Sequence, residues 1–315
     1  MRGSRTNPPA LKRFGQHFLI DRTALEAIAH AVVAEPGDTI VEIGPGRGAL
    51  TDILAGRPNQ LVAIEIDRAL SENLRERYAS NDRVTIVERD VLETNVAELA
   101  AGPFVVVGNV PYYITTPILF HVLHPPFPRS AVFLVQKEVA ERIVATPDSK
   151  AYGALSANVQ AIARAEILRT VPAGAFKPPP KVESSVVRVT PRANPLISPH
   201  EVDPYRGFVQ ALFGMRRKQL GNALCSAAQL SAEQAAAVLS DLGIDPKARP
   251  ETLSPLQFAE LMRAPHPQIK LTHYRISVSS GKTGGALLPK KTRPPRRVAS
   301  CCPPLPRLQR RSESS

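Results

Sequence analysis

The sequence contains no tryptophan and only three cysteines, Cys225, Cys301 and Cys302, among 315 residues. The cysteines show neither a disulfide framework nor metal-ligand spacing, and the seven histidines are scattered, so we expect no bound metal. No apolar run approaches the ~18 residues of a membrane-spanning helix, and the first eleven residues lack the apolar segment of a secretory signal. These absences argue against a disulfide-rich secreted protein and a membrane protein, and they predict a cytoplasmic location.

Acidic residues are few relative to basic ones, 28 against 40, which gives a net charge of +12. Most of this excess lies at the C-terminal end. From His266 to Ser315, eleven Lys and Arg accompany a single acid, Glu313, so this stretch carries 11 − 1 = +10 and the remainder 12 − 10 = +2. Any nucleic-acid binding by the folded part must therefore depend on local basic patches and not on bulk charge.

Short apolar segments alternate with helical stretches over much of the chain, which predicts an α/β fold with a parallel sheet covered on both faces. The expected strands are Thr39–Ile43, Leu61–Ile66, Val84–Val87, Phe104–Val107, Ala131–Val135 and, later, Ser185–Thr190. The expected helices are Asp21–Ala34 with Asp21 as N-cap, Ala49–Ala55, Arg68–Ala79, Tyr205–Phe213, Arg217–Ala227, Ala232–Leu242 and Ser254–Met262.

These patterns divide the chain into four parts. Residues 1–10 are polar and are expected to form a flexible arm. Residues 11–192 hold the strands and form the α/β domain, and the proline-rich segment Pro191–Pro204 is the expected linker to a small all-α domain at residues 193–264. Residues 265–315 combine proline, serine and basic residues without periodicity, so we expect them to be disordered.

A glycine-rich turn follows the first expected strand. Gly44 and Gly46 permit a tight turn and close approach by a ligand, and the next helix adds oriented N–H donors. Together with Ala49 they also match the dinucleotide fingerprint, which leaves a nicotinamide oxidoreductase open. Glu65 ends the second strand 65 − 44 = 21 residues later, the spacing of an acid that accepts from ribose hydroxyls. Asp67 competes for that contact or caps the next helix.

Two further groups favour adenine chemistry. Asp90, after the third strand, can accept from an adenine amino group, although a solvated loop acid is the alternative. Asn109, Val110, Pro111 and Tyr112 follow the fourth strand. An adenine amine is a poor nucleophile, and the Asn109 oxygen and the Val110 carbonyl, stiffened by Pro111, can accept its two N–H groups. Tyr112 offers a stacking face, so the motif predicts in-line methyl transfer without a covalent enzyme intermediate.

The Asn-x-Pro-Tyr motif resembles the signature of methyltransferases that act on exocyclic amines. Other segments resemble one family, the small-subunit ribosomal RNA adenine dimethyltransferases of the KsgA/RsmA type, in collinear order from about Leu11 to Ala264. The segments that carry this resemblance are KRFGQHFL at 12–19, QKEVA at 136–140, SKAYGALS at 149–156, FKPPPKVESSV at 176–186 and MRRKQL at 215–220.

The resemblance implies a Rossmann-like fold, S-adenosylmethionine as methyl donor, and a monomer whose partner is 16S rRNA in the small subunit or its precursor. The expected target is a pair of adjacent adenosines in the 3′-terminal hairpin, methylated at N6. The residue roles that it implies are donor binding by His17, Leu19, Gly44, Gly46, Glu65 (ribose), Asp90 (adenine) and Asn109, which also lies at the transfer centre, and base stacking by Phe176 opposite Tyr112.

Some positions depart from the family pattern. His17 stands where Asn is usual, Arg89 where Gly is usual, and Val110 and Tyr113 where Leu and Asn are commonest.

Three alternatives to the main hypothesis remain: a macrolide-resistance 23S rRNA methyltransferase, a ribosome-assembly or nucleic-acid-binding factor with secondary catalysis, and the oxidoreductase. The SKAYGALS segment resembles the small-subunit enzymes more closely. The intact Asn-x-Pro-Tyr motif argues against a loss of catalysis, and the oxidoreductase leaves it unexplained.

Overall fold

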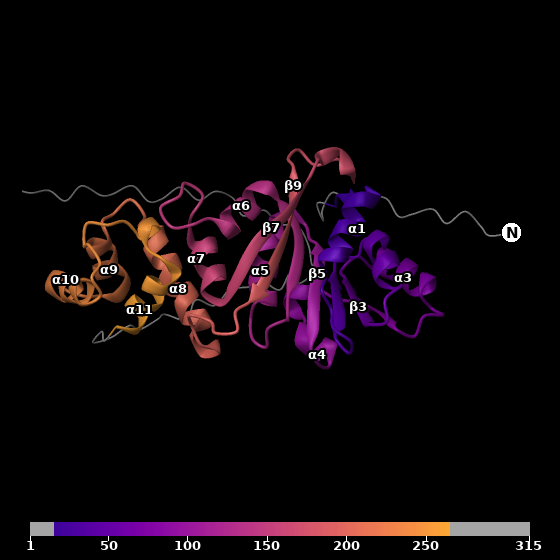
Figure 1. The fold of residues 1–315 in the computed structure, drawn as a ribbon, viewed down its shortest axis with the longest axis horizontal. Helices are drawn as coiled ribbons and strands as arrows, with labels where there is room; N and C mark the ends of the chain where they lie inside the picture. The colour runs from indigo at the N-terminus through magenta and orange to yellow at the C-terminus, as the bar shows by residue number, and fades with distance from the viewer. Residues whose placement is uncertain (1–15, 265–315) are drawn as a thin grey trace, which may run out of the picture. The chain divides into compact units, whose positions relative to one another are not determined.

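A computed structural model of the chain describes residues 16–264. Seven strands form its main sheet: β2 (Thr39–Ile43), β3 (Gln60–Glu65), β4 (Val84–Glu88), β5 (Phe104–Asn109), β6 (Ala131–Gln136), β7 (Ala163–Val171) and β9 (Ser184–Pro191). Their order is β4-β3-β2-β5-β6-β9-β7, and Figure 1 labels β3, β5, β9 and β7 within this sheet. The strands β2 to β6 are parallel, and β9 runs antiparallel between β6 and β7. A separate short ladder pairs β1 (Phe18–Leu19) with β8 (Phe176–Lys177).

The central strands are buried on both faces because successive side chains point to opposite sides of the sheet. On β5, Phe104 and Val106 belong to one apolar cluster, and Val105 and Val107 belong to the other. The first cluster includes residues of α4 (Val96–Ala100), α5 (Thr115–Val122), α6 (Lys137–Val144) and α7 (Ala154–Ile162). The second includes residues of α1 (Arg22–Ala31) and α2 (Ala49–Leu54), while α3 (Arg68–Arg77) follows β3. The predicted α/β fold with helices on both faces is confirmed.

The six expected strands are confirmed within two residues at each end. Asp21 is the N-cap of α1 as predicted, because its Oδ1 accepts from the Ala24 N–H at 2.7 Å. The strand β7 was not expected. It lies at the edge of the sheet, and a register shift between Ile167 and Arg169 interrupts the alternation of apolar and charged side chains that would have marked it.

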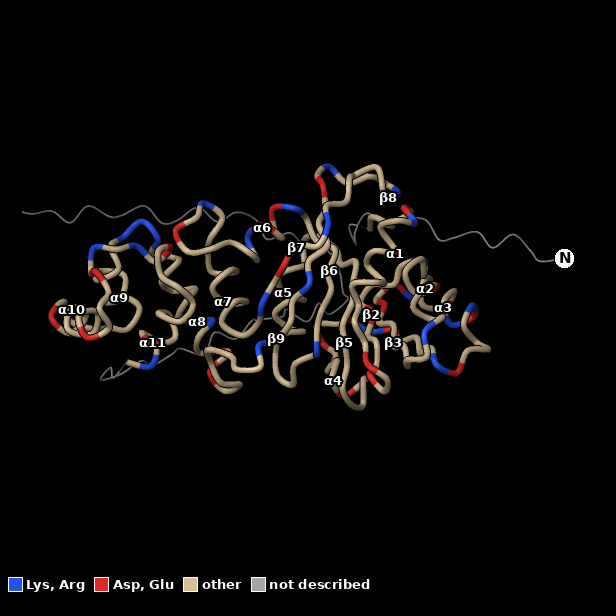
Figure 2. The backbone as a smooth tube through the Cα atoms, in the orientation of Figure 1, with Lys and Arg blue, Asp and Glu red and all other residues tan. Residues whose placement is uncertain are grey.

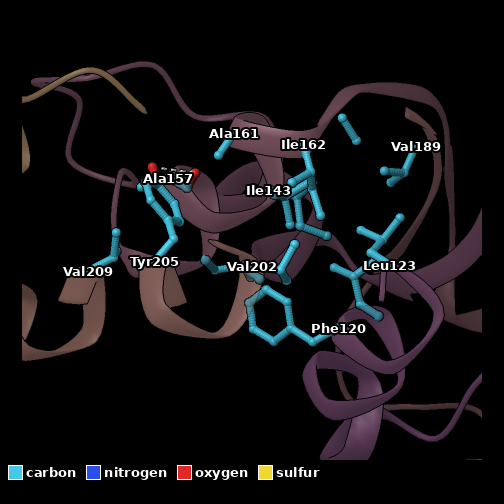
Figure 3. Close-up of a cluster of buried hydrophobic side chains, with 14 of the residues drawn as sticks. Phe120, Leu123, Ile143, Ala157, Ala161, Ile162, Val189, Val202, Tyr205 and Val209 are labelled. Carbon is cyan, nitrogen blue, oxygen red and sulfur yellow. Dashed lines mark hydrogen bonds between the residues drawn. The ribbon is translucent and has the colours of Figure 1, made fainter. Parts of the chain in front are cut away.

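Four helices follow the sheet, as expected: α8 (Val202–Gly214), α9 (Leu220–Ala228), α10 (Ala232–Asp241) and α11 (Pro255–Arg263). The Tyr205 hydroxyl of α8 lies 3.3 Å from the Ala157 carbonyl of α7 and 3.0 Å from the Pro255 carbonyl of α11. Figure 3 shows Tyr205 among apolar side chains that include Ile162 and Val209. One continuous apolar cluster thus joins the sheet to these helices, and the division at residues 192/193 stays a prediction.

Two local expectations differ from the structure. The helix expected at Arg217–Ala227 begins later, at Leu220 of α9, and Arg216, Arg217 and Lys218 form the turn after α8. The expected linker is packed along α7, since Ile197 is buried and the Leu196 N–H donates to the Ala161 carbonyl at 2.8 Å. The expected arm at residues 1–10 and the tail at 265–315 lie outside the described residues. Within residues 16–264, no helix combines the length and apolar composition needed to cross a membrane.

Candidate active site

The carboxyl ends of four neighbouring parallel strands, β2 to β5, open into a cavity of about 640 Å³. It lies at the end of β2, whose neighbours in the sheet are β3 on one side and β5 on the other. The order of the strands reverses direction here, and open α/β sheets bind ligands at such a position. Its size is typical of a small-molecule site. The predicted site residues that line it are His17, Leu19, Gly44, Gly46, Glu65, Asp90, Asn109, Val110, Pro111 and Tyr112.

The glycine turn after β2 forms one wall of the cavity. Gly46 has a φ of +58°, a conformation that L side chains rarely adopt, and an added Cβ would lie 3.1 Å from the Phe18 ring. The Arg47 guanidinium also lies against this ring, 4.2 Å from the Phe18 ring centroid. Phe18 therefore packs the N-terminal ladder onto the glycine turn, a role that its sequence position alone did not indicate.

Glu65 is held by the same turn. One carboxylate oxygen accepts from the Gly46 N–H at 3.0 Å and the other from the Asp67 N–H at 2.9 Å. Burial raises the pKa of Glu65, and these two N–H donors act against that rise. Asp67 instead caps α3, accepting from the Ala69 N–H at 3.0 Å, and is not among the cavity-lining residues. The geometry therefore favours Glu65 over Asp67 as the ligand-facing acid.

Glu42 is a second buried carboxyl group on the cavity wall, and the sequence motifs assign it no role. It lies within β2, and its Oε2 has no hydrogen-bond partner among the described residues. Burial raises the pKa of Glu42 to about 8, and the carboxylates of Glu65 and Asp52 add to the rise. The signal available in the sequence was an acid inside an otherwise apolar strand.

Asp90 caps a turn and also lines the cavity. Its Oδ1 accepts from the Leu92 N–H at 2.9 Å and so caps the 3-10 turn Val91–Glu93. The residue also lines the cavity, where a carboxylate has further lone pairs for a ligand N–H. Arg89, at the position where the family pattern has Gly, is an exposed residue on the same wall.

Asn109 ends β5 at the centre of the sheet. Its Nδ2 donates to the His17 carbonyl at 3.2 Å, an arrangement that fixes the amide and leaves Oδ1 as an acceptor for a substrate N–H. Val110 is buried at 2% exposure and is among the residues that line the cavity. Among the described residues, no backbone N–H donates to the Val110 carbonyl.

Tyr112 is held at both its hydroxyl and its ring. The hydroxyl lies 2.6 Å from Ser184 Oγ at the start of β9, and burial raises its pKa. The His17 ring stacks on the Tyr112 ring with centroids 5.7 Å apart and planes 22° apart. His17 Nδ1 in turn lies 2.8 Å from the Pro178 carbonyl. Ser184 and Pro178 both belong to the segment FKPPPKVESSV, so three distant parts of the chain meet here.

Phe176 does not lie where the expected stacking role requires. It pairs with Leu19 in the β1–β8 ladder, is 3% exposed, and belongs to an apolar cluster. It is not among the residues that line the cavity. In this structure the aromatic ring that faces Tyr112 is that of His17, so the stacking role of Phe176 is not supported.

No group of three or more His, Cys, Asp or Glu side chains within residues 16–264 is arranged to hold a metal ion. The acids of the cavity instead have other partners: Glu65 and Asp90 accept from backbone N–H groups, and Asp52 pairs with Arg77.

Comparison with known proteins decides the family. Residues 9–264 match the model of the ribosomal RNA adenine dimethylase family. The chain belongs to this family. Similar curated proteins carry the name ribosomal RNA small subunit methyltransferase A. That of Acidobacterium capsulatum is 43% identical over 80% of this chain and 89% of its own length, and that of Acinetobacter baylyi is 44% identical over 80% and 91%.

Solved structures agree on the fold. A dimethyladenosine transferase from Plasmodium falciparum has a TM-score of 0.68 and 25% identity, covering 78% of this chain and 96% of its own. The 23S rRNA methyltransferase ErmE has a TM-score of 0.62 and 28% identity, covering 78% and 98%. The methyltransferase fold expected from the motifs is thereby confirmed, and the oxidoreductase alternative is excluded.

Proposed function

We propose that this protein transfers methyl groups from S-adenosylmethionine to N6 of two adjacent adenosines in the 3′-terminal hairpin of 16S rRNA, during small-subunit biogenesis. The observation that carries the proposal is the position of Asn109 to Tyr112, at the end of β5 within the cavity, with Asn109 Oδ1 left open as an acceptor. Relatives named for the small subunit share 43–44% identity with the chain, against 28% for the 23S rRNA methyltransferase, and this difference favours 16S rRNA.

The cavity residues fit a donor of this kind. Glu65 has a fixed carboxylate suited to ribose hydroxyls, and Asp90 has spare acceptor capacity for an adenine amino group. The glycine turn allows the backbone to approach closely at Gly44 and Gly46. The buried carboxyl of Glu42, whose Oε2 has no partner among the described residues, adds a further polar group to the same cavity wall. When bound, S-adenosylmethionine supplies an activated methyl group on a sulfonium centre.

The residues of the Asn-x-Pro-Tyr segment prepare the adenine amine. Asn109 Oδ1 and the Val110 carbonyl accept its two N–H groups, which localises the nitrogen lone pair and directs it along the line of transfer. Tyr112 supports the base by stacking, and its hydroxyl contact with Ser184 fixes the plane of the ring. Because these groups are held in place before the substrate arrives, they contribute to catalysis through positioning and electrostatics.

RNA contact outside the cavity is proposed for the turn between α8 and α9. Arg216, Arg217 and Lys218 gather there, and Figure 2 shows this blue segment at the entry to α9. These side chains form no ion pair within residues 16–264, which leaves them available to phosphates. We propose that the protein works as a cytoplasmic monomer on the small subunit or its precursor, without a metal.

The test is incubation of the purified protein with labelled donor and with small and large ribosomal subunits that lack the modification, followed by mapping of the methylated nucleotides. We expect dimethylation at two adjacent adenosines of 16S rRNA. The variant Asn109→Ala should lose transfer while it retains donor binding, because it removes one acceptor and leaves the glycine turn intact. Methylation confined to 23S rRNA, or near-normal single-turnover rates in Asn109→Ala, would overturn the proposal.

A further inference from the structure

Tyr113 is an exposed aromatic side chain at the cavity. It follows Tyr112 in the 3-10 turn Tyr112–Ile114, and both residues line the cavity. Its side chain is 62% exposed, and among the exposed large apolar residues of the described part of the chain it is the only aromatic one. The protein has only 5% aromatic residues and no tryptophan, so an aromatic ring left in solvent beside the site calls for an explanation.

The two neighbouring tyrosines differ in what they do for the fold. Tyr112 is half-buried, contacts Ser184 through its hydroxyl and stacks with His17. For Tyr113 the structure gives no hydrogen bond from the hydroxyl and no ring contact among residues 16–264. Burial therefore does not explain this side chain, and its place among the cavity-lining residues leaves the ring open to a ligand.

We propose that Tyr113 is a stacking platform for the nucleotide next to the target adenosine. This inference rests on the proposed function. A base that enters the cavity must leave its stack, and the neighbouring base then has one face without a stacking partner. Exposed aromatic side chains compensate for this in single-stranded RNA, where unstacked bases lie on rings of the protein. Tyr112 serves the target base and Tyr113, one residue along the same turn, serves its neighbour.

Stacking on Tyr113 also affects the choice of substrate. Purines stack over a larger area than pyrimidines, so Tyr113 favours a target whose neighbour is a purine. In a pair of adjacent adenosines each member is the neighbour of the other. The ring at position 113 therefore acts on the choice of a tandem adenosine site, while Asn109 and Val110 act on the identity of the target base alone.

The test uses the full-length protein and two hairpin RNAs, one with adjacent adenosines and one in which the neighbour of the target is abasic. RNA affinity is measured by fluorescence anisotropy, and methylation by single turnover with labelled donor. On the adjacent-adenosine RNA, Tyr113→Ala should weaken binding about tenfold, the usual effect of removing one stacking platform, while Tyr113→Phe stays near the wild type. The matched control is Leu256→Ala, at an exposed apolar residue of α11 outside the cavity.

The abasic RNA isolates the stacking interaction. With this RNA, wild type and Tyr113→Ala should bind with equal affinity, because the base that Tyr113 supports is missing. Donor affinity should be the same in all variants. An equal decrease on both RNAs, or no decrease on either, would overturn the inference. A wild-type protein that binds both RNAs with the expected difference but methylates neither would instead refute the proposed function, so the two failures are distinguishable.

Discussion

Glu42 is a carboxyl group that the fold holds away from water beside two other acids, Glu65 and Asp52. The folded chain keeps its proton up to about pH 8, whereas the unfolded chain releases it near the ordinary pKa of 4.5. Between these values the folded state binds more protons than the unfolded state. The free energy of unfolding should therefore fall as the pH rises from about 4.5 to about 8.

The substitution Glu42→Gln keeps the shape of the side chain and removes its titration. Denaturant unfolding measured at several pH values between about 5 and about 8 should give a flatter stability profile for this variant than for the wild type. Glu65 also has a raised pKa, so part of the slope should remain. An exposed acid such as Glu72, in a surface ion pair with Arg68, provides the control Glu72→Gln. A slope unchanged by Glu42→Gln would show that Glu42 is ionised in the folded protein.

Single residues show how far the sequence alone indicates which side chains line the cavity. The 21-residue interval selected Glu65, and the structure separates it from Asp67 because only Glu65 faces the cavity. The same approach failed for Phe176, whose motif says nothing about whether its ring turns toward the cavity or the core. It also assigned no role to Ser184, because the hydroxyl contact with Tyr112 joins residues 72 positions apart.

At the scale of elements, the strands that carry the site were predictable and the others less so. Each of β2 to β5 is a short apolar run, and its last residues face the cavity because parallel strands end at the same edge. The strand β7 escaped detection because it is an edge strand with exposed residues and a bulge near Leu168. The start of α9 was placed too early because basic residues tolerate both a helix and the turn that the structure shows.

The turn between α8 and α9 supports a prediction about RNA affinity. Replacing Arg216, Arg217 and Lys218 with Ala together should weaken RNA binding and reduce its salt dependence, by roughly 0.7–0.9 in the logarithmic slope for each phosphate that the protein no longer neutralises. Binding titrations across a range of salt concentrations measure this slope. The control is Arg68→Ala on α3, an exposed residue paired with Glu72. An unchanged slope in the triple variant would mean that this turn does not touch phosphates.

At the scale of the whole molecule, the helices α8 to α11 share their core with the sheet. The Tyr152 hydroxyl donates to the Leu253 carbonyl at 2.9 Å, and the Arg206 guanidinium lies 4.2 Å from the Phe120 ring centroid. A backbone hydrogen bond of 2.9 Å also joins residues 148 and 251. These interactions couple the helical region to α5 and to the segments that flank α7. We therefore expect the two regions to unfold together and not as independent units.

Most of the net positive charge of the chain lies beyond its described residues. From His266 onward the chain carries +10 of the +12 net charge, and this stretch also lies outside the family match, which ends at residue 264.

Truncation after Ala264 should leave donor affinity, thermal stability and the choice of target adenosines unchanged. It should lower RNA affinity at low salt and reduce the salt slope by a little under one unit for each phosphate that the tail neutralises, as expected for anchoring without sequence preference. Circular dichroism measures the thermal stability, calorimetry the donor affinity, and mapping of the methylated nucleotides the choice of target adenosines. Salt titrations of RNA binding measure the RNA affinity and the salt slope. If the truncated chain unfolds at a lower temperature or methylates other nucleotides, the tail belongs to the working structure, and the boundary at residue 264 is wrong.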